Sequence, residues 1–287
     1  MNGPGIDKSL VRRAFAKAAA GYDAVAGLQR DIGERLLERL DYIKLQPRRV
    51  LDLGCGTGVA SGALLKRYAK AQVIALDFAL PMLTLARRQG RWLRRPRCLC
   101  ADAEQLPLAD QSLDLVFSNL ALQWCPDLGQ VFAETRRVLR PGGLFMFSTF
   151  GADSLKELRA AWSQVDGYSH VNSFLDLHQV GDLLLATPFQ DPVVDLDRLQ
   201  CQYGSVADLM GDLKQLGAHN VTQGRPRGLT GRRRLTAMLE AYGGMRVDEK
   251  YPVSYEIIYG LAWVPEHSSP PGTQAIPLDA LRRSLPF

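Results

Sequence analysis

The chain has 287 residues, of which 46% are hydrophobic and 23% charged, a composition typical of a globular protein. Its 35 Lys and Arg against 30 Asp and Glu give a net charge of only +5, which argues against a duplex-binding protein. The amino terminus lacks an apolar signal segment, and no run of about 18 uncharged apolar residues occurs, so we expect neither secretion nor a membrane span. Five cysteines without disulfide-type spacing indicate reduced thiols in a cytoplasmic protein.

Two of these cysteines, Cys98 and Cys100, share one face of a predicted strand and could in principle hold a metal ion. No second Cys or His cluster completes a set of four ligands. We therefore predict that both are small buried hydrophobic residues and that the chain holds no metal.

Residues 8–20 and 24–40 have the apolar spacing of two helices, with Gln29, Arg30 and Glu34 on the polar face of the second. Short apolar runs then alternate with amphipathic segments, which predicts a parallel sheet with helices on both faces. The predicted strands are 50–53, 72–77, 97–100, 113–118 and 144–149. The predicted helices between them are 58–68, 80–88 and 128–139, the last ended by Pro141-Gly142-Gly143.

The pattern loosens after residue 150. Ser154-Leu-Lys-Glu157 has the spacing of a capping box that opens a helix to about Trp162, and a second helix is predicted near 178–185. Two late strands are predicted at 193–203 and 253–264. The resulting division is an amino-terminal helical lid (1–46), a core (47–203 and 251–266), an insertion (204–250) over one edge of the sheet, and a mobile tail (267–287).

The strongest motif is Val50-Leu-Asp-Leu-Gly-Cys-Gly-Thr-Gly58, a strand that runs into a glycine loop and then a helix. Gly54, Gly56 and Gly58 allow a ligand to approach the backbone closely. The loop lacks the third glycine of the dinucleotide fingerprint and the Gly-Lys-Ser/Thr of a phosphate loop. Asp52 would repel a pyrophosphate, so the motif favours a cationic ligand.

Acidic and polar residues follow the next three predicted strands. Asp77 lies where a carboxylate can accept hydrogen bonds from both ribose hydroxyls of a nucleoside. Asp102 follows the third strand and could accept from an adenine amino group, and Asn119 ends the fourth. Each acid has a plainer interpretation, Asp77 as a helix cap and Asp102 as a turn former. Their order and spacing together predict a nucleoside-binding cofactor site.

This pattern resembles the class I S-adenosylmethionine methyltransferases. The flanking segments are similar to the malonyl-acyl-carrier-protein O-methyltransferases of biotin synthesis, and the similarity extends to about residue 264. The segments that carry this closer resemblance are Phe15-Ala-Lys-Ala-Ala-Ala-Gly-Tyr-Asp23, Asn119-Leu-Ala-Leu-Gln-Trp124, Asp153-Ser-Leu-Lys-Glu-Leu158, His170-Val-Asn-Ser-Phe174, Asp212-Leu-Lys-Gln-Leu-Gly-Ala218, Gly228-Leu-Thr-Gly231 and Tyr251-Pro-Val-Ser-Tyr255.

The resemblance implies a Rossmann-like α/β fold with a seven-stranded, mostly parallel sheet. It also implies methyl transfer from S-adenosylmethionine to the free carboxylate of a malonyl thioester, which leaves S-adenosylhomocysteine. The thioester would be carried by acyl carrier protein or coenzyme A, and we expect neither nucleic acid nor membrane as a partner. The implied cofactor residues are Gln29, Asp52, Gly54, Gly56, Gly58, Asp77, Phe78, Met82, Asp102, Ala103 and Asn119.

The substrate side of the site is less constrained by motifs. Tyr22 is the candidate catalytic residue, since it could contact the sulfonium, although it could equally dock a helix. Candidate substrate contacts are His170, Asn172, Phe174, Lys214 and Arg225. Because a malonyl carboxylate is already ionised at neutral pH, no general base is required. A tight cation on the reacting oxygens would stabilise the ground state more than the transition state.

Two arginine clusters, at 87–97 and 225–234, could each steer an acidic carrier protein, and the second is favoured because the insertion should border the substrate mouth. Two other functions remain open. One is a methyltransferase of the same fold with another small-molecule acceptor. The other is a protein hydroxylase similar to the complex I assembly factors, which would need an iron site from His170 and His178 with Asp166 or Asp176.

Overall fold

The computed structural model describes residues 5–218, 220–222, 224–225, 228 and 230–266. The expected tail, 267–287, lies outside this part of the chain. Seven strands form one sheet in the order β3-β2-β1-β4-β5-β7-β6, which confirms the predicted α/β fold. They are β1 (Arg49–Leu53), β2 (Gln72–Asp77), β3 (Arg97–Cys100), β4 (Leu113–Asn119), β5 (Leu139–Phe150), β6 (Gln190–Tyr203) and β7 (Tyr251–Trp263). The first five are mutually parallel, and β7 is antiparallel to both β5 and β6.

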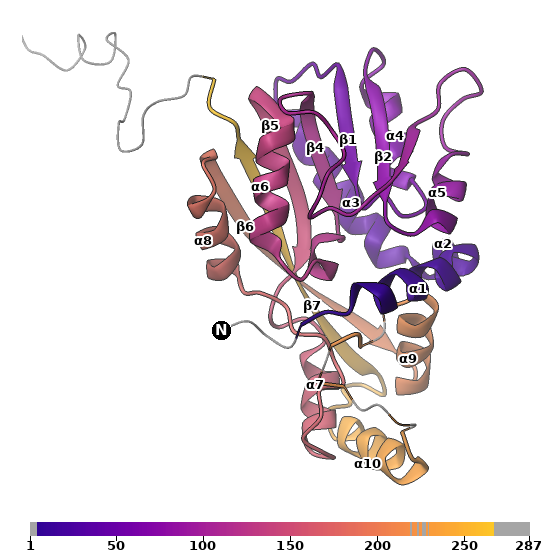
Figure 1. The fold of residues 1–287 in the computed structure, drawn as a ribbon. Helices are drawn as coiled ribbons and strands as arrows, with labels where there is room; N and C mark the ends of the chain where they lie inside the picture. The colour runs from indigo at the N-terminus through magenta and orange to yellow at the C-terminus, as the bar shows by residue number, and fades with distance from the viewer. Residues whose placement is uncertain (1–4, 219, 223, 226–227, 229, 267–287) are drawn as a thin grey trace, which may run out of the picture.

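Helices cover both faces of this sheet (Figure 1). They are α1 (Lys8–Ala18), α2 (Tyr22–Val25), α3 (Gly27–Arg39), α4 (Val59–Arg67), α5 (Leu80–Ala86), α6 (Leu128–Val138), α7 (Lys156–Ser163), α8 (Leu177–Ala186), α9 (Val206–Gln215) and α10 (Arg232–Gly243). None of the helices in the described residues is long and apolar enough to cross a membrane.

Alternation along the strands divides the core into two layers. Phe117 of β4 packs with Ile32 of α3 and Leu64 of α4 on one face, whereas the adjacent Val116 packs with Phe132 of α6 on the other. Both neighbours are fully buried, because a central parallel strand is covered by helices on its two sides. The sheet therefore holds its carboxyl-terminal loops on a rigid base.

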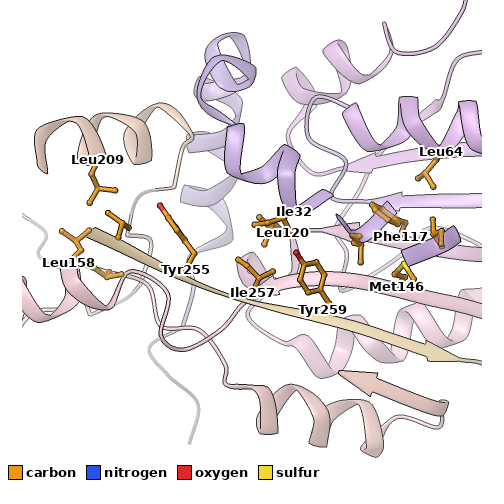
Figure 2. Packing of buried hydrophobic residues seen from close by; sticks show 14 of the residues in the cluster. Ile32, Leu64, Phe117, Leu120, Met146, Leu158, Leu209, Tyr255, Ile257 and Tyr259 are labelled. Carbon is orange, nitrogen blue, oxygen red and sulfur yellow. The ribbon is translucent and has the colours of Figure 1, made fainter. Parts of the chain in front are cut away.

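The layer that contains Phe117, Ile32 and Leu64 continues beyond the sheet toward α7 and α9. Figure 2 shows its side chains running from Phe117 and Met146 along β7 to Leu158 of α7 and Leu209 of α9. The insertion thus lies beyond the ends of β6 and β7, where α10 packs against α7, and not over the edge of the sheet as predicted. A shared core joins it to the sheet, so we expect the two parts to unfold together.

Three local predictions are wrong. Ser154 and Glu157 do not form a capping box, because their side chains bond β7: Ser154 with the backbone of Glu256, and Glu157 with the backbone N–H of Ser254 at 2.9 Å. The predicted helix 8–20 is present but ends at Ala18, where a short 3₁₀ turn follows, and the predicted helix 24–40 is interrupted at Ala26. β5 begins at Leu139, before the Pro-Gly-Gly sequence, because its first residues pair with Leu113.

The prediction for Cys98 and Cys100 is also wrong with respect to burial. β3 is an edge strand, and both residues are exposed on it. All five cysteines are free thiols.

Candidate active site

A pocket lies at the carboxyl ends of β1, β2 and β4, between the glycine loop and the amino-terminal helices α1 to α3. It gathers the candidate catalytic residue Tyr22 and ten of the eleven predicted cofactor residues. These ten are Gln29, Asp52, Gly54, Gly56, Asp77, Phe78, Met82, Asp102, Ala103 and Asn119. Ligand sites of open α/β sheets occupy this position. The structure thus brings these residues together, and their role as cofactor contacts stays a prediction.

The glycine loop needs glycine for two different reasons. Gly54 has φ +73°, and a Cβ there would lie 2.2 Å from the Cβ of Ala121. Gly56 has φ +53° but open space around it, so its requirement is conformational only. Gly58 does not line the pocket: a Cβ there would lie 2.7 Å from the Cα of Ala86, so this glycine allows α4 to pack on α5.

Asp77 holds the loop as well as facing the pocket. Its Oδ2 accepts from the backbone N–H of Gly56 at 3.0 Å, and its Oδ1 accepts from the N–H of Ala79 at 2.8 Å. Burial raises the pKa of Asp77 to about 6, although both N–H groups oppose this rise. The carboxylate therefore fixes the end of β2 to the glycine loop in addition to any ligand contact.

Asp52 is 1% exposed and lies beneath the loop. Its Oδ2 accepts a hydrogen bond from the hydroxyl of Ser61 at 2.5 Å. Burial raises the pKa of Asp52 to about 7, and the Ser61 hydroxyl opposes that rise. An acid that is costly to ionise at this buried position would be stabilised in its charged form by a cationic ligand.

The raised pKa of Asp52 predicts that the unliganded protein loses stability as the pH rises. An unfolded Asp titrates near pH 4, so its neutral form favours the folded state below that pH. This contribution is lost as the pH rises through about 7. Asn cannot ionise, so the variant should not share this loss. We expect the free energy of unfolding of Asp52→Asn minus that of wild type to increase by up to about 4 kcal/mol between pH 4 and pH 8.

Urea denaturation across this pH range measures the effect. Ser61→Ala provides the control, because loss of its hydrogen bond should raise the pKa of Asp52 further and steepen the decline. Parallel pH profiles for wild type and Asp52→Asn would contradict the assignment.

The amino-terminal helix α1 is attached to the carboxyl end of β3 by one lysine. Lys8 Nζ lies 2.6 Å from Asp102 Oδ2 and 2.6 Å from Glu104 Oε2. Asp102, the predicted adenine contact, also accepts from the N–H of Glu104 through Oδ1. Lys8 is thus already neutralised by two carboxylates within the pocket wall.

The next helices are attached to the glycine loop and to β4. The hydroxyl of Thr57 donates to Asp23 Oδ1 at 2.7 Å, and Asn119 Nδ2 donates to the backbone carbonyl of Gln29 at 2.9 Å. The side-chain Oε1 of Gln29 is buried and has no hydrogen-bond partner. An unpaired buried oxygen in a pocket wall indicates a place for a ligand donor.

Aromatic side chains form the apolar part of the wall. Phe15 packs edge-on against Trp124 at 5.2 Å between ring centroids and lies 6.4 Å from Tyr22 and 6.5 Å from Phe78. Burial, and then the charges of Asp77 and Asp23, raise the pKa of the Tyr22 hydroxyl above its usual value. Tyr22 is therefore a neutral hydrogen-bond donor at the pocket. Phe15 and Trp124 entered the sequence analysis only as motif positions.

The five predicted substrate residues do not line this pocket. The His170 ring stacks on the Trp162 ring with 3.7 Å between ring centroids, and His170 Nε2 lies 2.8 Å from Asp166 Oδ1. Asn172 is buried, and its Oδ1 accepts from the N–H of Val221. Phe174 packs against Phe150. These contacts hold the segment that follows α7 to α7 itself, to β5 and, through Val221, to the insertion. A substrate role for these residues stays a prediction.

The two predicted cations of the insertion lie near the amino-terminal helices. Lys214 is exposed on α9, one turn before Gly217, whose Cα faces the backbone of Ala14 in α1. Arg225 donates to the carbonyl of Thr222, and Thr222 forms a β-bridge with Ile6. The insertion and the lid are therefore adjacent beside the pocket, although neither cation reaches its wall.

Two further hypotheses can be compared with this geometry. The described residues contain no group of three or more His, Cys, Asp or Glu side chains that could hold a metal ion, so His170, His178, Asp166 and Asp176 do not assemble an iron site. The arginines at 87–97 follow α5 and precede β3, at the end of the sheet opposite the pocket (Figure 1). In the second cluster, Arg227 lies outside the described residues.

Comparison with known proteins identifies the family. A family model described as a methyltransferase domain matches residues 51–147. A malonyl-[acyl-carrier protein] O-methyltransferase of Gallionella capsiferriformans is 50% identical over 266 residues, which cover 91% of this chain and 92% of the relative. One of Halorhodospira halophila is 47% identical and covers 97% and 96%. The chain belongs to this family. It is accordingly an S-adenosylmethionine-dependent methyltransferase, as its motifs predicted.

Solved structures of other methyltransferases share the fold of this chain. A putative methyltransferase from Bacillus halodurans aligns with a TM-score of 0.57 at 19% identity, over 80% of this chain and 98% of that one. A Haemonchus contortus phosphoethanolamine N-methyltransferase, solved in complex with S-adenosyl-L-methionine, aligns with a TM-score of 0.54 at 16% identity, over 87% and 57%. The Rossmann-like prediction is thereby confirmed.

Proposed function

We propose that this chain transfers a methyl group from S-adenosylmethionine to the free carboxylate of a malonyl thioester and so forms its methyl ester. The acidic, partly aromatic pocket closed by α1 to α3 carries the proposal. Relatives that are 47–51% identical over at least 90% of this chain, each named for malonyl-acyl-carrier protein, supply the substrate class. The product is an early intermediate of biotin synthesis.

The pocket residues fit the cofactor in three ways. Asp52 and Asp77 suit a ligand with cationic and hydroxyl groups, because carboxylates attract the first and accept hydrogen bonds from the second. Phe78 and Met82 provide an apolar wall for a base, with Asp102 beside them. The unpaired Oε1 of Gln29 is available to a ligand donor.

The chain itself has to bind, align and exclude water. When bound, S-adenosylmethionine supplies an electrophilic methyl group on its sulfonium. The malonyl carboxylate is ionised at neutral pH, so no proton has to be removed before it attacks. The chain has only to align a carboxylate oxygen with that methyl group. Tyr22 is placed to contribute a neutral hydroxyl and a ring face, and the helices that hold it cover the pocket.

Neutralisation of the malonyl carboxylate explains why such a reaction is useful. Enzymes that elongate acyl chains must desolvate their substrate in an apolar tunnel, which is costly for a free carboxylate. A methyl ester is neutral and can be extended like an ordinary acyl group. The five free thiols are consistent with a reducing compartment, so we place the reaction in the cytoplasm.

The experiment that tests the proposal incubates purified protein, S-adenosylmethionine and malonyl-acyl-carrier protein and then measures the intact mass of the carrier. We expect a methyl increment on the malonyl carrier and none on the acetyl carrier, which lacks the free carboxylate. A parallel reaction with malonyl-coenzyme A identifies the preferred thiol carrier. An unchanged mass in both malonyl reactions, with cofactor binding confirmed by calorimetry, would indicate a different acceptor.

A further inference from the structure

Large hydrophobic side chains project into solvent at the end of the sheet opposite the pocket. Tyr42 is 90% exposed, Leu93 88% and Trp92 83%, the highest values among the large hydrophobic residues of the described chain. Trp92 and Leu93 lie in the turn between α5 and β3, and Tyr42 lies between α3 and β1, so all three precede the start of a parallel strand. Single exposed apolar residues are ordinary, but several on one face indicate an interaction surface.

Two contacts at the carboxyl end of α4 bring these segments to one face. Arg67, the last residue of α4, forms an ion pair at 2.5 Å with Asp41, the neighbour of Tyr42. The next residue, Tyr68, accepts a hydrogen bond through its carbonyl from Arg94 NH2 at 2.7 Å. The turn and the segment before β1 are therefore both attached to the same helix end.

The turn that carries Trp92 and Leu93 is held at its base. The backbone groups of Arg91 and Arg94 exchange two hydrogen bonds, of 3.1 Å and 2.7 Å. Gly90 has φ +86°, and a Cβ there would lie 2.3 Å from the carbonyl oxygen of Arg94, so only glycine fits at the entry to the turn. The two apolar side chains thus stand at the tip of a preformed projection.

Cations whose charge is not neutralised surround this tip. Among the described residues, no carboxylate forms an ion pair with the arginines at 87, 88, 91, 94, 95 and 97, nor with Lys44, Arg48, Arg49, Lys66 and Lys70, which lie just before β1 and β2 or at the start of β1. Three acids at this end are already paired: Asp41 with Arg67, Asp110 with Arg137, and Asp114 with Arg140. The small net charge of the whole chain therefore conceals a strongly basic face, which lies opposite the acidic pocket.

A convex apolar tip among arginines fits an anionic bilayer better than other acidic partners. A bilayer deforms around the tip, its headgroup level accommodates the amphipathic ring of tryptophan, and its phosphates attract the arginines. Single-stranded nucleic acid is bound by a groove with successive aromatic platforms, whereas Trp92 is the single aromatic residue of the turn. A carrier protein docked here would lie at the wrong end of the sheet to present a thioester to the pocket.

We propose that this basic face binds the surface of an anionic phospholipid bilayer, with Trp92 and Leu93 inserted at headgroup level. The pocket, at the other end of the sheet, then faces away from the bilayer and stays accessible to its ligands. The expectation that the chain has no membrane partner considered spanning segments, and a peripheral contact needs none. The proposal is independent of the methyl acceptor.

Sedimentation of the purified protein with sucrose-loaded vesicles tests the proposal. Wild type should partition at least roughly tenfold more strongly onto vesicles of equal parts phosphatidylglycerol and phosphatidylcholine than onto pure phosphatidylcholine, and about 1 M sodium chloride should weaken this binding. The double variant Trp92→Ala/Leu93→Ala should bind roughly tenfold more weakly, since the inserted apolar groups are lost. Arg91→Gln/Arg95→Gln should lose about as much through charge alone.

Arg232→Gln/Arg233→Gln is the matched control. It removes the same charge from exposed positions of α10, which lies at the far end of the molecule from α4 (Figure 1), so vesicle binding should stay within about twofold of wild type. Circular dichroism checks that each variant is folded.

Four outcomes would overturn the proposal. They are the absence of wild-type binding to anionic vesicles, full binding by Trp92→Ala/Leu93→Ala, an equal loss in the α10 control, and binding of a single-stranded oligonucleotide in place of vesicles. A raised KM of Trp92→Ala/Leu93→Ala for soluble malonyl-acyl-carrier protein, without vesicle binding by wild type, would assign the face to the carrier protein instead.

Discussion

Asp77→Ala should reduce the affinity for S-adenosylhomocysteine by more than about 100-fold, since it removes the charged acceptor that we propose for the ribose hydroxyls. It should also lower the free energy of unfolding by about 2 kcal/mol, because the N–H groups of Gly56 and Ala79 lose the carboxylate that accepts from them. Isothermal calorimetry measures the first effect, and urea denaturation of the unliganded protein measures the second.

The matched variant Asp77→Asn separates these two roles. The amide keeps one acceptor oxygen and the shape of the side chain, so the loss of stability should be smaller than in Asp77→Ala. Its NH₂ group cannot accept from a ribose hydroxyl, so cofactor affinity should still fall at least about tenfold. Binding by Asp77→Ala within a few-fold of wild type would contradict the assignment of Asp77 as a cofactor contact.

Gly54→Ala is expected to have the second large effect. Its Cβ would lie 2.2 Å from the Cβ of Ala121 at a backbone φ of +73°. Overpacking and a left-handed non-glycine residue together should cost about 2–5 kcal/mol of stability, and the displaced loop should abolish cofactor binding. Urea denaturation and calorimetry measure these two losses.

Gly56→Ala provides the control at a neighbouring position. Gly56 also has a positive φ, +53°, but a Cβ there would have no atom within 4 Å. Only the conformational cost of about 1–2 kcal/mol should remain. Equal destabilisation by the two substitutions would show that contact with Ala121 is not what requires glycine at position 54.

Local sequence signals predicted the sheet closely. The predicted limits of β2 and β3 match the structure, and those of β1 and β4 differ by one residue. The buried strands β1, β2 and β4 could be recognised because they are short apolar runs bounded by loops. β5 begins five residues earlier than predicted, since pairing with Leu113 extends it through a sequence that by itself favours a turn. The supposed capping box at Ser154 and Glu157 was wrong for a similar reason: its side chains bond strand β7, about 100 residues away.

The glycine loop with Asp52, and the acids Asp77 and Asp102, could be predicted because each lies at or just after the carboxyl end of a strand. Parallel strands bring these ends to one edge of the sheet. Helical periodicity placed Gln29, Arg30 and Glu34 on a polar face but could not show that this face lines the pocket. Lys8 reaches Asp102 across 94 residues, a distance that no local pattern encodes. The sequence by itself therefore determined the fold, the cofactor class and the strand-end residues. Only the tertiary structure decided which charges of the lid line the pocket, because a long-range contact depends on how separate elements pack and not on the spacing within either one.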